Sequence, residues 1–131
     1  MPFQDKSDYL AGKIAEHNLR GIPYTPPTDH YLALFTASPG KAGSLTNEVA
    51  AAEYHRQLVV FGPEVGGICL NTAVIQFAAA LTPWGLITYG ALFDALSAGN
   101  MLYFGPALAV IDVTVGKVYK IAIGQFSVGE A

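Results

Sequence analysis

Charged residues are scarce in this 131-residue chain, where they make up 13% of the sequence, about half of what is usual in a soluble domain. The seven Lys and Arg residues and the ten Asp and Glu residues give a net charge of −3. No stretch carries the cluster of basic side chains that binds a nucleic acid backbone. We therefore expect no nucleic acid partner.

Cysteine is almost absent as well. The single Cys69 excludes an internal disulfide, so folding does not require an oxidising compartment. Because it lies between Ile68 and Leu70, we expect a buried, inert thiol. The first residues, MPFQDKSDY, lack the layout of a signal peptide, and we expect no export signal.

Catalytic motifs are also missing. The chain contains no Gly-x-Ser-x-Gly motif of the kind that presents a nucleophilic serine. The Gly40-Lys41 pair does not form a phosphate-binding loop, because Ala42 stands where Ser or Thr must hold magnesium and Phe35 stands where glycine is needed.

Acidic residues and histidines do not form a metal or hydrolase pattern. Asp29-His30 and Glu53-x-His55 could each supply two metal ligands, but neither pair repeats at the spacing of a known site. Nothing pairs two carboxylates across a cleft, as glycoside hydrolysis requires, although three are expected on loops: Glu48, Glu53 and Glu64. We expect no metal, no cofactor and no enzymatic activity.

The longest nearly uncharged stretch lies between Glu64 and Lys117, where the only charges are Asp94 and Asp112. A free monomer of this size exposes much of that stretch to water. Either copies of the chain or another protein cover it, or it belongs to a compact sandwich whose exposed positions are Thr, Ser, Gly and Gln. We favour the interface, because large apolar surfaces mark contact sites.

One part of this stretch has the length of a membrane span. Residues 73–93 carry no charge, and about 20 apolar residues can cross a bilayer as a helix. However, Pro83 beside Trp84-Gly85 is a turn signal, and neither flank has the Lys/Arg cluster that orients a span. Because the segment is also rich in β-branched and aromatic residues, we interpret it as strands and expect no membrane partner.

The N-terminal part predicts a helix over Ser7 to Arg20, capped by Ser7 or Asp5 and ended by Gly21. Three prolines in residues 22–28 then predict an extended connector. We divide the chain into a helix and connector arm, residues 1–29, and a β domain, residues 30–131.

The rest of the chain predicts short strands separated by Gly and Pro turns. Such spacing without helical crossovers is typical of an all-β, antiparallel sandwich or barrel. The predicted strands are His30–Thr36, Arg56–Phe61, Ile68–Leu70, Ala73–Ala78, Trp84–Phe93, Met101–Phe104, Ala107–Val113, Val118–Ile123 and Gln125–Val128.

Several side chains are candidates for surface contacts. Arg56 opens an apolar strand, where its guanidinium either makes a bidentate pair across an interface or is hydrated at the strand edge; both remain open. Aromatic residues offer a possible sugar-binding platform, although aromatics at alternating strand positions are more often core: Trp84, Tyr89, Tyr103 and Tyr119.

Segments along nearly the whole chain resemble a known family. The matching pieces, in order, are DYLAGKI, YLALFTASPGKAG, EVAAAEYHRQLVVFG, NTAVIQFAAA, WGLITYGALFDALSAGNMLYFG and residues 116–128. The chain resembles a family of small tailed-bacteriophage virion proteins, often described as phage tail fibre proteins and in some phages identified as capsid decoration (cement) proteins. The resemblance implies a β-sandwich or jelly-roll-like module that assembles with copies of itself on the particle.

From the resemblance we expect a capsid decoration protein that bridges neighbouring major capsid proteins, made in the bacterial cytoplasm and located on the capsid surface. The alternative is a tail fibre or tail-tip module that binds a host receptor or glycan. Expected partners are the major capsid protein and copies of the chain, as dimers or trimers. We expect contacts from the helix, the connector and the 41–52 loop, with candidates Tyr9, Leu10, Ile14, Pro26, Pro27, Asn47, Glu48, Arg56 and Trp84.

Overall fold

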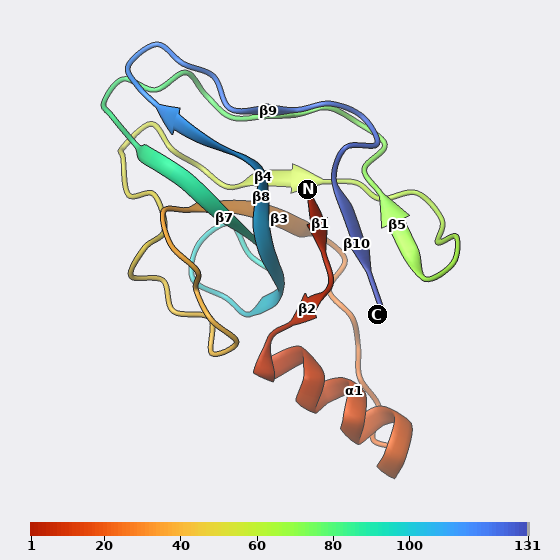
Figure 1. Ribbon diagram of the computed structural model, residues 1–131. Helices are drawn as coiled ribbons and strands as arrows, with labels where there is room; N and C mark the ends of the chain where they lie inside the picture. The colour runs from red at the N-terminus through yellow and green to blue at the C-terminus, as the bar shows by residue number, and fades with distance from the viewer. Residues whose placement is uncertain (131) are drawn as a thin grey trace.

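The structure, a computed structural model, describes residues 1–130, which form short strands and a single α-helix (Figure 1). One layer is a five-stranded antiparallel sheet in the order β2 (Asp5–Lys6), β8 (Met101–Val113), β7 (Gly85–Phe93), β3 (His30–Phe35) and β4 (Gln57–Val59). The facing strands form a sheet of β1 (Pro2–Phe3), β10 (Ser127–Gly129) and β5 (Ile68–Leu70), and a pair of β6 (Ile75–Gln76) and β9 (Lys120–Ile121).

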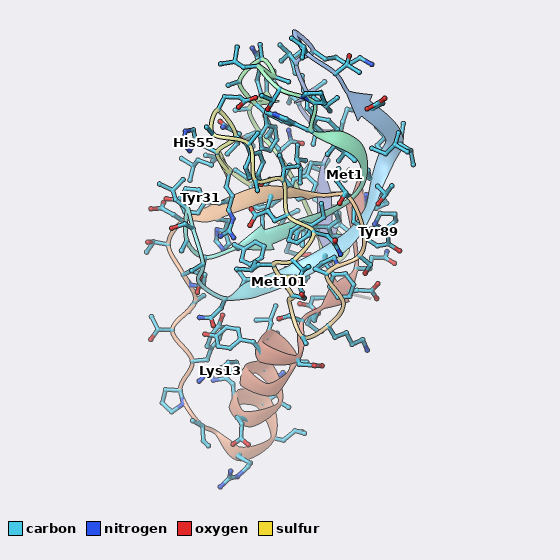
Figure 2. All side chains as sticks on the ribbon, turned by 90° about the vertical axis from the view of Figure 1, so that its left-hand side faces the viewer. Met1, Lys13, Tyr31, His55, Tyr89 and Met101 are labelled. Atoms are coloured by element: carbon cyan, nitrogen blue, oxygen red, sulfur yellow. The ribbon has the colours of Figure 1, made fainter. Side chains whose placement is uncertain are left out.

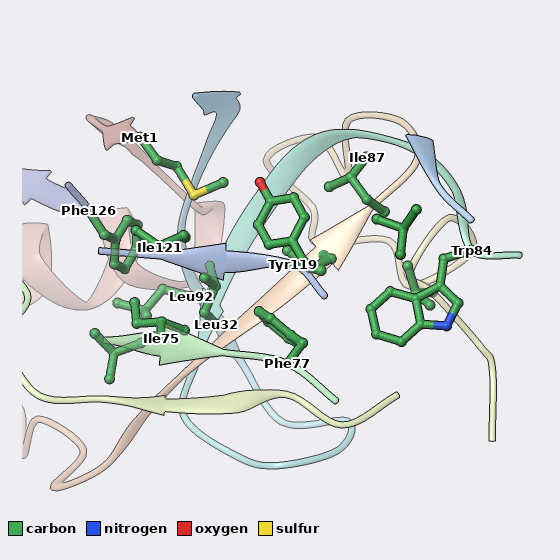
Figure 3. Packing of buried hydrophobic residues seen from close by; sticks show 14 of the residues in the cluster. Met1, Leu32, Ile75, Phe77, Trp84, Ile87, Leu92, Tyr119, Ile121 and Phe126 are labelled. Atoms are coloured by element: carbon green, nitrogen blue, oxygen red, sulfur yellow. The ribbon is translucent and has the colours of Figure 1, made fainter. Parts of the chain in front are cut away.

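The main core lies between these layers (Figure 3). Leu32 and Leu92 of the five-stranded sheet belong to the same buried cluster as Ile75, Ile121 and Phe126 of the facing layer. This arrangement confirms the predicted all-β sandwich. Sheets of five, three and two strands do not establish a jelly roll, which closes from eight strands in two Greek keys.

The alternating pattern of β3 explains why the five-stranded sheet is buried on both faces. Leu32 and Leu34 belong to the main core, whereas Ala33 and Phe35 belong to a second cluster on the opposite face. The same pattern in β7 adds Phe93 to the second cluster. Both faces of this sheet therefore need a cover.

The loop over residues 41–52, from which we expected partner contacts, packs for much of its length against its own chain. Its Lys41 carbonyl accepts a hydrogen bond from the Asp8 amide at 2.8 Å, and Glu48 forms an isolated bridge with Phe35. Val49, later in the loop, is buried. The loop packs along β3 because its backbone polar groups find partners there, and Asn47 remains exposed.

The first six residues form two strands that the sequence did not predict. β1 pairs in parallel with β10, and β2 pairs antiparallel with β8 at Tyr103 and Phe104. Met1 and Phe3 are buried in the main core. The segment therefore joins both layers. Sequence patterning did not identify its strands because two residues are too few to show a periodicity.

The predicted helix is confirmed as α1 (Asp8–Arg20). The Oγ atom of Ser7 accepts a hydrogen bond from the Leu10 amide at 3.1 Å, and Gly21 adopts the left-handed conformation that ends the helix. Figures 1 and 2 show α1 standing away from the sheets, with the label of Lys13 on its exposed length.

The nearly uncharged stretch forms β5, β6, β7 and β8, so the interpretation as strands is confirmed. Within residues 1–130, the single helix falls short of what a bilayer crossing requires. The two strands predicted over residues 101–113 are one strand, β8, with an irregularity opposite Ile87 and Tyr89. Pro106 lies at this irregularity, where its missing N–H is tolerated.

Candidate interaction surfaces

Arg56 lies inside the molecule, with 3% of its surface exposed. Its Nε and Nη2 atoms donate to Oε2 and Oε1 of Glu48 at 2.8 and 2.9 Å, which makes a bidentate pair. Its Nη1 atom donates to the carbonyl oxygens of Ala95 and Ala98, both at 2.9 Å. The guanidinium also lies 3.9 Å from the ring centroid of Phe93.

These contacts correct the sequence-based alternatives for Arg56. Its partner is Glu48 of the same chain, so it is neither hydrated at a strand edge nor free to pair across an interface. Glu48 also accepts from the Tyr54 hydroxyl at 2.8 Å, and that hydroxyl accepts from the Leu34 amide at 3.0 Å. Burial, together with the Glu48 charge, raises the pKa of Tyr54.

Trp84 is also buried, with 6% of its surface exposed. Its Nε1 atom donates to Oε1 of Glu53 at 3.1 Å, and its ring meets that of Tyr54 edge-on at 5.5 Å. Tyr119 is 4% exposed, and burial raises its pKa to about 12. Trp84 and Tyr119 therefore belong to the core, the commoner place for aromatic residues at strand positions, and they are not part of an exposed aromatic platform.

The Glu53 carboxylate organises the turn before β7. Besides Trp84, its Oε1 atom accepts from the amides of Leu81 and Thr82 at 2.7 and 2.9 Å. Hydrogen bonds from its own backbone amide, and then from Trp84, Leu81 and Thr82, lower the Glu53 pKa to about 2, although burial acts in the opposite direction.

We expect the surroundings of Trp84 to depend on pH through Glu53. The folded pKa of about 2 lies below the ordinary value of 4.5, so the stabilisation is complete above pH 4.5 and is lost as the pH falls through 2. Trp84 is the only tryptophan, so its fluorescence reports this loss directly. In Glu53→Gln the transition near pH 2 should disappear; an unchanged transition would contradict the assignment.

The remaining predicted contact residues lie on α1, the connector and the 41–52 loop. Leu10 is 4% exposed and packs within the chain, so it is not available at the surface. The others keep accessible surface in residues 1–130, and their role as partner contacts stays a prediction: Tyr9, Ile14, Pro26, Pro27 and Asn47.

Gly12 offers a test of whether this face of α1 is free of contacts within the isolated chain. A Cβ atom at this position would meet nothing within 4 Å, and glycine within a helix is about 1 kcal/mol less stable than alanine. Gly12→Ala should therefore raise the free energy of unfolding of the isolated chain by about 1 kcal/mol, measured in urea. A decrease would show that an unseen intrachain contact requires glycine.

Large exposed apolar side chains are spread over the nearly uncharged stretch and α1. Leu19 near the end of α1 is 83% exposed, which sequence patterning did not identify. Those in the stretch between Glu64 and Lys117 are Val65, Ile68, Leu70, Val74, Leu81, Leu86, Leu96, Leu108, Val110 and Val115. Of the two alternatives for this stretch, the distribution favours a surface that contacts other proteins over a free surface of Thr, Ser, Gly and Gln.

An apolar pocket of about 470 Å³ opens between the two layers, and we call it the inter-sheet pocket. Its apolar lining includes Phe61, Cys69, Leu92 and Val128, so Cys69 is half-buried rather than fully buried as expected. It is wide enough for aliphatic side chains.

Two polar residues of the inter-sheet pocket, Tyr103 and Glu130, bond to each other. The Tyr103 hydroxyl donates to Oε1 of Glu130 at 2.6 Å, and Lys6 forms an ion pair with the same carboxylate. Burial opposes ionisation of Glu130, but hydrogen bonds from Lys6 and Tyr103 lower its pKa overall. Burial also lowers the pKa of His30, against a raising effect of nearby carboxylates.

Metal-ligating side chains do not gather in the part of the chain that the structure describes. Among residues 1–130, no group of three or more His, Cys, Asp or Glu side chains is placed to hold an ion. The pairs Asp29-His30 and Glu53-x-His55 thus gain no third ligand there.

Comparison with known families places nearly the whole chain in a phage protein family. A family model described as Podophage GP4 fiber I protein gp80 matches residues 5–129, nearly the whole chain. No curated protein matches the chain significantly.

Proposed function

The chain belongs to the Podophage GP4 fiber I protein gp80 family, and from that premise we propose that it is a non-enzymatic building block of a tail fibre, held there by apolar contacts. Membership makes it a phage fibre structural protein and a virion component. The proposal adds its place on the tail and the way in which it is held.

The observation that supports apolar assembly is the nature of the exposed surface. Between Glu64 and Lys117 only two residues are charged, yet many large apolar side chains in this stretch are exposed, with Leu81 at 72% and Leu108 at 63%. Such surfaces mark protein contacts. Burying apolar surface is worth about 25 cal/mol per Å², and association costs consume a large part of it, so each copy needs several such contacts.

The family favours a fibre over the capsid decoration that the sequence resemblance suggested first. A capsid cement and a fibre subunit would both be held by the burial of apolar surface between subunits. They differ in their location on the particle and in their number of copies. A capsid cement covers the joints of the whole head, whereas a fibre subunit is present in few copies.

Recognition of a host glycan is less well supported than assembly. A sugar platform needs aromatic faces open to solvent, but Trp84 and Tyr119 are buried. The hydroxyl of the half-buried Tyr103 is already bonded to Glu130. We therefore assign the chain an assembly role within the fibre.

The proposal is tested by the copy number of the chain in purified particles. Gel densitometry against the major capsid protein should give a small, fixed number of copies per particle. A number comparable to that of the capsid protein would contradict the fibre role and restore the cement role.

A further inference from the structure

Most of the outer edge of strand β8 has no partner strand. β2 pairs with this edge only at Tyr103 and Phe104, so within residues 1–130 no strand pairs with the outer side of residues 105–113. The backbone N–H and C=O groups along such an edge are available for hydrogen bonds to another strand. A free edge of this length is a place where a second chain can extend a sheet.

Part of this edge has no strand partner on its inner side either. Residues 107–110 lie between two pairs of the β7–β8 register, Ile87 with Ile111 and Tyr89 with Pro106, and have no paired residue in β7. They nevertheless remain part of strand β8. The irregularity therefore does not end the free edge.

The side chains along this edge give it little protection. Natural sheets blunt free edges with prolines, charged side chains or bulges. Here Pro106 stands at one end and Asp112 at the other, and residues 107–111 between them read Ala-Leu-Ala-Val-Ile. Leu108 and Val110 are 63% and 60% exposed. A β-strand is the partner that covers such side chains and also satisfies the backbone beside them.

A second copy of the same strand meets this requirement. When two β8 edges pair antiparallel about a two-fold axis at Val110, Val110 lies opposite its counterpart and residue 107 of each copy lies opposite residue 113 of the other. We propose that two copies of this chain pair in this way through residues 107–113, which joins their five-stranded sheets into one. The inference deepens the proposed function, on which it rests, by naming a contact through which fibre subunits associate.

The free length of the edge supports this register. An axis at Ala109 would bring Thr114 of the second copy to Phe104, where Asp5 of β2 already pairs. With the axis at Val110 the paired segment ends before β2, and the chain then turns away over residues 114–117. The edge therefore has the length of the strand that it receives.

Charge also favours a second copy as the partner. Asp5 and Lys117 are both exposed, and neither forms an ion pair within residues 1–130. Lys117 Nζ donates instead to the backbone carbonyl of Asp112 at 3.1 Å. In the proposed pairing, the turn that carries Lys117 in each copy reaches the end of β2 that carries Asp5 in the other. A hollow of about 290 Å³ beside Asp5 and Gly105 leaves room there, and opposite charges meet at both ends of the joined strands.

The two-fold axis allows a direct test with one cysteine. In a Cys69→Ser background, Val110→Cys places two identical thiols opposite each other, at the Cα separation of about 4.5–5.5 Å that a disulfide spans. Under a mild thiol oxidant this variant should form a covalent dimer on a non-reducing gel. The matched control is Leu86→Cys in the same background, since Leu86 is similarly exposed at 53% but lies on β7, away from the edge.

The dimer itself is measured by sedimentation equilibrium of the full chain. Val110→Lys should weaken it by at least about tenfold, because it removes a buried valine contact and sets like charges opposite each other. Leu86→Lys should leave the dimer unchanged, and both variants should keep the circular dichroism spectrum of the wild type.

Three results would each overturn the edge pairing: a monomeric wild-type chain, cross-linking of Val110→Cys no greater than that of Leu86→Cys, or a dimer that Val110→Lys does not weaken. None of them would move the chain from the fibre, because its copy number and location on the particle are measured independently.

Discussion

Replacing Arg56 by alanine should lower the free energy of unfolding by about 3–5 kcal/mol, the usual result of breaking a buried ion pair by removing one partner. The change leaves the Glu48 carboxylate without its bidentate donor and the carbonyls of Ala95 and Ala98 without theirs. Three segments then lose their common anchor: the 41–52 loop, the start of β4 and the turn after β7. Urea denaturation followed by circular dichroism measures the loss.

Two variants separate charge from geometry at this site. Arg56→Lys keeps the positive charge but not the planar fork that bonds Glu48 and two carbonyls together, so it should recover little of the lost stability. Replacing both Arg56 and Glu48 by apolar residues of similar volume should recover more, because no unpaired charge remains buried. A loss below about 1 kcal/mol in Arg56→Ala, the size typical of exposed pairs, would contradict the buried anchor.

Replacing Phe3 by alanine should lower the free energy of unfolding by about 3–5 kcal/mol, as large-to-small changes of buried aromatic residues do. Phe3 is fully buried, and its ring meets that of Phe126 edge-on at 4.9 Å. Two glycines give it room: a Cβ at Gly105 would lie 2.7 Å from the Phe3 ring, and one at Gly90 would lie 2.9 Å from it. The mutation empties a space that these glycines leave open.

The matched control for Phe3 is Pro2→Ala, because Pro2 is the exposed member of the same strand. It should change the free energy of unfolding by less than about 0.5 kcal/mol, as most surface substitutions do. Equal effects of the two variants would mean that β1 contributes only its backbone pairing with β10. A truncation of residues 1–28 would remove Phe3 and is therefore unsuitable for testing the role of α1 in assembly.

The parts of the fold that the sequence predicted are those fixed by local signals. Ser7 and Gly21 mark the ends of α1 through capping chemistry that is confined to neighbouring residues. The short apolar run HYLALF, followed by the Ser38-Pro39-Gly40 turn, predicted β3. In both cases the determining contacts lie within a few residues of each other.

The parts that the sequence did not predict depend on distant contacts. β1 and β2 are strands because they pair with strands far along the chain: Pro2 with Ser127 and Lys6 with Tyr103. A strand of two residues is too short to show a hydrophobic periodicity. Likewise, sequence reasoning left Arg56 open between a pair across an interface and hydration at a strand edge, because its partner Glu48 reaches it only through the fold of the 41–52 loop over β3. Trp84 was a candidate contact because sequence alone does not reveal that Glu53 holds it inside.

The central claim is that this chain builds a fibre, and a cryo-electron density map of the intact phage particle tests it most directly. The account predicts density for the sandwich in a fibre outside the head, with apolar residues of the nearly uncharged stretch facing neighbouring subunits. Density in many copies over the joints between capsid subunits, with no copy in a fibre, would contradict it.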